Sequence, residues 1–142
     1  MKKALAVILM LQASIAQGYE IDLTVDQLLA ESNVVVVGKL SKVKDWIEGD
    51  FARGEGFIEV SETLLGAIPR KKRLNLRWAN RLYRSGAVEF EDTGDEEFVW
   101  FLWRVKDGSF RARYSSCKAP LDEKTQILAA IKKRQAEQGG AR

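Results

Sequence analysis

The sequence contains no histidine, a single cysteine and only two prolines among its 142 residues. Without histidine, the chain lacks the commonest general base, the serine–histidine and cysteine–histidine nucleophile pairs, and the usual zinc sites. The single cysteine, Cys117, excludes an intrachain disulfide and any CxxC motif. We interpret Cys117 as a packed residue near a strand end, with an intermolecular disulfide or a reactive thiol as alternatives. We predict no cofactor and no bound metal.

Long apolar runs are also scarce, and the one at the amino terminus is shorter than the roughly 20 residues needed to span a bilayer. Residues 1–16 read MKKALAVILMLQASIA, with Lys2 and Lys3 first, an apolar run next, and the small residues Ser14 and Ala16 at the end. This is the pattern of a secretory signal peptide cleaved after Ala16. We therefore expect an exported bacterial envelope protein, periplasmic or secreted, that is not an integral membrane protein.

Excess charge of one sign is nearly absent once the signal peptide is removed. The whole chain has 23 basic and 20 acidic residues, a net charge of +3. Removal of residues 1–16 takes away Lys2 and Lys3 and no acidic residue, which leaves a net charge of +1. This balance argues against a nucleic-acid-binding protein. The composition is that of a globular chain, and the length of residues 17–142 fits one domain.

The pattern of apolar residues predicts a mainly β domain. We expect strands at residues 33–44, where four consecutive valines lie, and at 57–63, 72–78, 98–105 and 109–115. A bulge or bend is expected near Gly38. Residues 45–56 contain three glycines and are expected to form a loop, and residues 79–86 are expected to be irregular. Asp107-Gly108 predicts a hairpin turn with positive φ at both positions.

A short helix is expected at each end of the domain. The first lies within residues 21–32, with Thr24 as its cap. The second follows Pro120, has Asp122 and Glu123 in its first turn, and ends before Gly139. An apolar stripe on this helix should pack on the sheet, and it consists of Ile127, Leu128 and Ile131.

Five strands flanked by two short helices predict a small β-barrel. The segments SNVVVVGKLSKV, GFIEVSETLLGAIPRKKRLNLRW and EEFVWFLWRVKDGSFRARY resemble bacterial exported domains related to the tissue inhibitors of metalloproteinases and the netrin-like module. The resemblance covers roughly residues 30–132, and it implies a five-stranded, closed barrel of the oligonucleotide/oligosaccharide-binding (OB) type. In the animal inhibitors, an amino-terminal cysteine chelates the protease zinc. Here the expected mature end is Gln17-Gly18-Tyr19, so no residue of this chain matches the inhibitory motif.

Basic and aromatic residues are interleaved in the segment from residue 70 to residue 84, RKKRLNLRWANRLYR. Guanidinium groups beside aromatic rings suit phosphate, sulfate or anionic sugars. The residues predicted to bind such a ligand, or a partner, are Arg73, Arg77, Trp78, Arg81, Tyr83 and Arg84. The alternative is a solvated strand face that is neutralised by the acidic segment that follows.

That acidic segment, residues 89–97, holds six carboxylates among nine residues, EFEDTGDEE. We interpret it as an acidic loop paired with the basic segment, with a calcium site as the alternative. The run FVWFLWRV contains Trp100 and Trp103, which alternation places on opposite faces of a strand. We interpret both as packing residues, with stacking on a sugar or a partner as the alternative.

Two carboxylates at a suitable separation could hydrolyse a glycoside. The candidate pairs are Glu59 with Glu62 and Asp92 with Asp95. Nothing in the sequence brings either pair to that separation, so we expect no enzyme. We expect an exported, non-catalytic barrel that binds a partner protein or an anionic polysaccharide or lipid of the envelope. The alternatives are a metalloproteinase-inhibitor-like protein that acts through a surface without cysteine, and a small carboxylate-dependent hydrolase.

Overall fold

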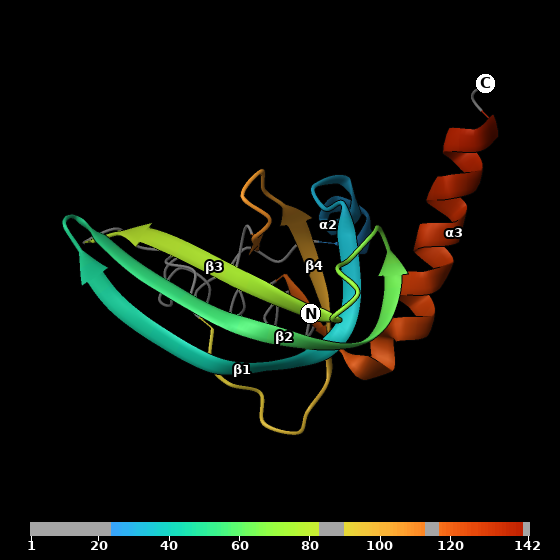
Figure 1. Cartoon of the computed structure of the whole chain (residues 1–142). Helices are drawn as coiled ribbons and strands as arrows, with labels where there is room; N and C mark the ends of the chain where they lie inside the picture. Colours follow the sequence, from blue (N-terminus) through green and yellow to red (C-terminus); the bar gives the residue numbers. More distant parts are fainter. Residues whose placement is uncertain (1–23, 83–89, 113–116, 141–142) are drawn as a thin grey trace, which may run out of the picture.

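The computed structural model describes residues 24–82, 90–112 and 117–140, and these are mainly β-structure (Figure 1). The signal segment predicted at residues 1–16 lies outside them. In chain order the elements are helix α2 (Val25–Ala30), strands β1 (Val34–Glu48), β2 (Phe51–Leu65), β3 (Arg73–Arg81), β4 (Phe98–Arg104), β5 (Phe110–Arg111) and β6 (Lys118–Pro120), the 3-10 turn η1 (Leu121–Glu123) and helix α3 (Lys124–Gly140).

Strand β1 begins with the four consecutive valines, residues 34–37, and all four side chains are buried. Both faces of the strand are therefore covered at this end. The pairing of β1 with β2 shifts register between residues 35 and 36, at Gly38, and between residues 41 and 44, where Lys42 has a φ of 56°. The predicted bulge near Gly38 is confirmed. The bulge between residues 41 and 44 lets Val43 pack against the core, although simple alternation from Leu40 would turn its side chain outward.

The loop predicted at residues 45–56 is wrong. These residues form the end of β1 and the start of β2, and only Gly49 and Asp50 lie between the strands. Gly49 has a φ of 60°, which suits the first position of a two-residue hairpin loop. Gly54 and Gly56 lie inside β2, where a Cβ atom would come within 3.0 Å of a neighbouring side chain. These glycines are required by close packing and do not mark a loop. Strand β3 likewise continues to Arg81, so the irregular segment predicted from residue 79 begins too early.

Five strands form a ring in the order β1-β2-β3-β5-β4, and β4 pairs with β1 to complete it. Neighbouring strands are antiparallel except β3 and β5, which are parallel through Leu76 and Phe110. The short strand β6 adds to β4 on the side away from β1. Figure 1 shows that β1, β2 and β3 are long and curved and extend well past β4. The mainly β prediction is confirmed, with a ring of five strands and a helix at the carboxyl end.

Strand β4 occupies residues 98–104, close to the prediction, and Trp100 is completely buried. The indole Nε1 of Trp100 donates a hydrogen bond of 3.0 Å to the carbonyl oxygen of Gly38. Trp103 is half-buried. The packing interpretation is therefore confirmed for Trp100. Cys117 is buried beside β4, where its carbonyl oxygen accepts a hydrogen bond from the amide of Phe101.

The hairpin predicted at Asp107-Gly108 is present, because the amide of Val105 donates to the carbonyl of Ser109 at 2.9 Å. Of the two turn residues only Gly108 has a positive φ, 86°, so the expected conformation of Asp107 is wrong. The amide of Gly108 donates to the carbonyl of Val105, which is the pattern of a type I turn followed by a left-handed glycine. The returning strand is described only at residues 110–111, because residues 113–116 lie outside the described part.

Both terminal helices are present. Thr24 caps α2 as predicted, because its hydroxyl accepts from the amide of Gln27 while the Gln27 side chain accepts from the amide of Thr24. Helix α3 buries Ile127 and Ile131 in the core. It begins at Lys124, after the 3-10 turn that holds Asp122 and Glu123, and it runs to residue 140, past the expected end. In the described residues, no helix is long and apolar enough to cross a membrane.

Candidate functional site

The basic residues of β3 lie on the face of the strand that points away from the core. Leu74 and Leu76 are completely buried. Arg77 follows Leu76 directly, and its side chain is 48% exposed. Arg73 and Arg81 have the same parity as Arg77, so all three point outward. Strand alternation thus places three of the predicted ligand-binding residues along one outer face.

Carboxylates of the neighbouring strand β2 neutralise part of this row. Arg73 Nε lies 3.1 Å from Glu59 Oε1, and Arg77 Nε lies 3.3 Å from Glu55 Oε2. The guanidinium of Arg73 also lies 4.1 Å from the ring centroid of Phe57. The acidic segment at residues 89–97 was expected to neutralise the arginines. For Arg73 and Arg77 this is wrong, because glutamates of the paired strand β2 already neutralise them.

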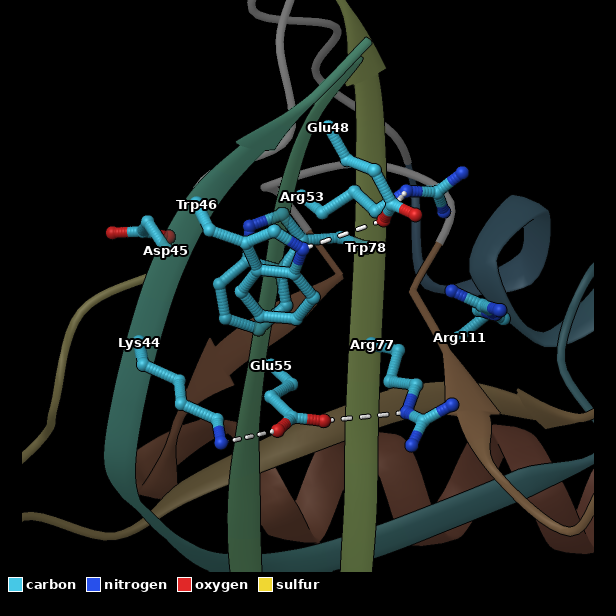
Figure 2. Close-up of a pocket in the computed structure, with 10 residues that line it drawn as sticks. Lys44, Asp45, Trp46, Glu48, Arg53, Glu55, Arg77, Trp78 and Arg111 are labelled. Atoms are coloured by element: carbon cyan, nitrogen blue, oxygen red, sulfur yellow. Dashed lines mark hydrogen bonds and ion pairs between the residues drawn. The ribbon is translucent and has the colours of Figure 1, made fainter.

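A pocket of about 630 Å³ lies over β1, β2 and β3 and reaches β5 (Figure 2). Its charged residues comprise four cations and three carboxylates. The lining residues are Lys44, Asp45, Trp46, Glu48, Arg53, Gly54, Glu55, Arg77, Trp78 and Arg111. Arg77 and Trp78 come from the segment singled out in the sequence. The other lining residues were not predicted, because most of them fall in the residues that were expected to form a loop.

Glu55 lies at the centre of this pocket and is held between two cations, as Figure 2 shows. Lys44 Nζ lies 2.9 Å from Glu55 Oε1, and the side chain of Glu55 is only 14% exposed. The hydrogen bond from Lys44 lowers the pKa of the Glu55 carboxyl below its ordinary value, and the charges of Lys44 and Arg77 and a hydrogen bond from Asn75 lower it further, although partial burial opposes them. Glu55 is therefore a stable carboxylate at neutral pH.

A second cluster lies nearer the β1–β2 turn. Glu48 Oε2 lies 3.0 Å from Arg53 Nε and accepts a long hydrogen bond of 3.5 Å from Trp46 Nε1. Trp46 is 39% exposed and contributes an aromatic surface to the pocket. Strand pairing explains this grouping, because Trp46 and Arg53 are cross-strand partners.

Trp78 differs from the arginines around it in sequence, because its parity turns it toward the core. It is buried and lies 5.2 Å from Phe90 in an edge-to-face arrangement. Gly54 is its cross-strand partner, and a Cβ atom at Gly54 would come within 2.2 Å of the indole. Trp78 therefore forms a wall under the pocket and supports the strands above it. Tyr83 and Arg84, which were also predicted to bind the ligand, lie outside the described residues.

The described part of the acidic segment attaches to β1. Asp92 Oδ1 accepts from the amide of Val43 at 2.9 Å, and Thr93 exchanges hydrogen bonds with the backbone of Leu40. Glu97 accepts a hydrogen bond from the hydroxyl of Ser61. Within the described ranges, no group of three or more acidic or cysteine side chains is arranged to hold a metal ion.

Of the carboxylates proposed for acid–base chemistry, Glu59 and Glu62 have separate cationic partners. Glu59 pairs with Arg73, and Glu62 Oε1 lies 2.6 Å from Lys124 Nζ of α3. Each of these glutamates thus forms an ion pair with a different cation, and the two are held by contacts to different elements. Asp92 is occupied as an acceptor for the backbone of β1.

Comparison with known proteins does not assign the chain to a family. No protein-family model matches it, and no curated protein matches it.

Proposed function

We propose that this chain is an exported, non-catalytic binding module on an OB-type barrel, and that the pocket over β1, β2 and β3 binds an anionic group. The group would belong to an acidic polysaccharide or lipid of the envelope, or to the acidic surface of a partner protein. Export rests on the signal-like pattern of residues 1–16. The fold assignment is supported by the order of the five-strand ring and by the resemblance of the strand segments to exported domains of the netrin-like group.

The place of the pocket supports a binding role. In OB-type barrels, the face formed by the second and third strands carries ligands such as oligosaccharides and oligonucleotides. The pocket here is lined from β2 by Arg53 and Glu55 and from β3 by Arg77. The chemistry of these residues favours an anionic sugar or another acidic group over an apolar ligand.

The observation that carries the proposal is that Arg53 and Arg77 contact carboxylates of the protein through Nε. Figure 2 shows the terminal nitrogens of Arg77 directed away from Glu55. Arg111, at the far wall of the pocket, forms no ion pair within the described ranges, although its charge acts on Asp107. Terminal guanidinium nitrogens are the groups that bind carboxylate, sulfate or phosphate with two parallel hydrogen bonds. The exposed indole of Trp46 adds a surface for stacking.

The state of Glu55 supports binding over catalysis. A general acid at neutral pH requires a carboxyl group with a raised pKa. The pKa of Glu55 is lowered instead, by the hydrogen bond from Lys44 and by the nearby charge of Arg77. Glu55 is thus suited to fixing the two cations in position and not to protonating a leaving group.

The test is retention on immobilised heparin and on immobilised lipopolysaccharide, with an acidic protein as a third support. We expect Arg77→Gln and Arg111→Gln to lower the salt concentration that elutes the protein, because each removes a cation from the pocket. Lys71→Gln, an equal loss of charge at an exposed turn residue, should have little effect. The support on which the variants differ most identifies the source of the anionic group. Equal elution of all three variants and the unmodified protein on every support would refute the proposal.

A further inference from the structure

The second half of β1 has an open edge. β1 pairs with β4 only through residues 34–38. Further along the strand, the backbone amide of Leu40 donates to the hydroxyl of Thr93, and the amide of Val43 donates to the carboxylate of Asp92. From Lys44 to Glu48, β1 pairs with β2 on one side. On the other side, no strand pairs with it among residues 24–82, 90–112 and 117–140. An edge of this kind presents unpaired backbone groups to another strand.

The hairpin geometry shows which backbone groups point outward. Glu48 and Phe51 flank a two-residue loop, so they form a hydrogen-bonded pair, and alternate pairs along the hairpin are hydrogen-bonded in turn. The amide and carbonyl groups of Asp45 and Ile47 therefore point toward the open edge. The side chain of Ile47 is 71% exposed, which makes it an unusual apolar residue on this surface.

We propose that two copies of this chain pair antiparallel along residues 44–48, with a two-fold axis at Trp46. Asp45 then lies opposite Ile47 of the partner subunit, and the two outward-facing residues of each copy exchange four backbone hydrogen bonds across the axis. Trp46 lies opposite Trp46 of the partner subunit at a non-hydrogen-bonded position, where cross-strand side chains approach most closely. Such an interface uses the same patch on both copies.

We infer that a second copy of the chain pairs with this open edge, because the edge sequence, Lys-Asp-Trp-Ile-Glu, is complementary to itself in this register. Lys44 lies opposite Glu48 of the partner subunit, once on each side of the axis. Both side chains can accept a further partner, since Lys44 is 67% exposed and Glu48 is 65% exposed despite their contacts with β2. A shift of two residues would instead place Asp45 opposite Asp45 of the partner subunit, or Trp46 opposite Glu48 of the partner subunit. Opposite charges favour the register centred on Trp46, and like charges oppose the shift that pairs the two Asp45 residues.

The dimer is tested by sedimentation equilibrium of the full protein, as natural processing leaves it, over a range of concentrations. We expect a monomer–dimer equilibrium. Lys44→Glu and Glu48→Lys should each raise the dimer dissociation constant at least about tenfold, because each changes two attractive pairs into two repulsive pairs. An equimolar mixture of the two variants should form dimers again. In that mixture, residue 44 of each copy meets an opposite charge at residue 48 of the other.

The mixture separates the interface from effects on the fold, because mixing leaves the internal contacts of each variant unchanged. Lys71→Glu and Glu96→Lys are matched controls that change charge equally at exposed positions away from the edge, and they should not change the dimer. The proposal is overturned if the protein remains monomeric at every concentration, which would leave the edge to a strand of another protein. It is also overturned if the single variants dimerise as the unmodified protein does, or if their mixture remains monomeric. Lys44, Trp46 and Glu48 also line the pocket, so retention of the interface variants on anionic supports does not separate the two proposals. Arg77→Gln separates them, because it should weaken retention on those supports and leave the monomer–dimer equilibrium unchanged.

Discussion

Replacement of Glu55 by glutamine should weaken the fold and strengthen anion binding at the same time. In the structure Glu55 binds two cations that face the pocket, Lys44 at 2.9 Å and Arg77 at 3.3 Å. Glutamine keeps the shape of the side chain and removes its charge. The four cations of the pocket would then face two carboxylates in place of three. A structural role alone predicts lower stability, whereas a role as an internal counter-ion also predicts tighter binding of an external anion.

The expected size follows from the exposure of the partners. Lys44 is 67% exposed and Arg77 is 48% exposed, and ion pairs of this kind contribute at most about 1 kcal/mol each. Since glutamine can still hydrogen-bond, we expect Glu55→Gln to lower the free energy of unfolding by about 1 kcal/mol, which corresponds to a melting temperature about 4 °C lower. A similar energy released to the ligand would tighten anion binding about fivefold.

Urea denaturation and heparin affinity measured on the same samples test both parts. The lowered pKa of Glu55 means that its stabilisation is present above its ordinary pKa of 4.5 and is lost as the pH falls through the lower folded-state pKa. The stability difference between the unmodified protein and Glu55→Gln should therefore disappear in acid. Glu96→Gln, an exposed carboxylate outside the pocket, is the control. Unchanged or weaker heparin binding by Glu55→Gln would refute the counter-ion role.

Two further predictions concern packing and processing. Gly54→Ala places a methyl group 2.2 Å from the indole of Trp78, so we expect a loss of about 1–3 kcal/mol in the free energy of unfolding, with a changed tryptophan fluorescence spectrum. Gly139→Ala, where nothing lies within 4 Å, should leave stability unchanged or raise it slightly, and an equal loss in both variants would contradict the packing argument. The proposed export predicts that the protein recovered from the envelope of a bacterial host begins at Gln17, as measured by mass spectrometry of the intact chain, and recovery of the intact precursor in the cytoplasm would contradict export.

Strands with a clear local pattern could be predicted from the sequence. The alternation of Leu74 and Leu76 with polar residues located β3, and the run of valines located the start of β1. The extension of the β1–β2 hairpin could not be predicted in this way. Gly54 and Gly56 are typical of loops when only neighbours in sequence are considered, but here they lie under side chains from other strands. Glycine is needed at these two positions because of tertiary packing, so local propensity wrongly predicts a loop there.

Only part of the candidate site could be predicted from the sequence, because the rest depends on contacts between strands that are distant in sequence. Arg77 was found because basic residues cluster in sequence, yet its contacts with Glu55 and its position near Arg111 depend on strand register and on the ring order. Trp78 has the parity of Leu74 and Leu76, and this alternation already indicated a core-facing side chain. The exposed Trp46 gave no signal, because it lay in residues assigned to a loop.

The ring order also has a consequence for how the chain acquires its shape. β1, β2 and β3 are successive antiparallel neighbours, so they can pair through contacts between segments that are close in sequence, without any residue beyond Arg81. The last pairings to form join β1 to β4 and β3 to β5. Their partners lie far apart in the sequence, 68 residues for Val34 and Leu102 and 34 residues for Leu76 and Phe110. Closing such long loops is entropically costly. We therefore expect a three-stranded meander to form early and the last pairings to limit the folding rate.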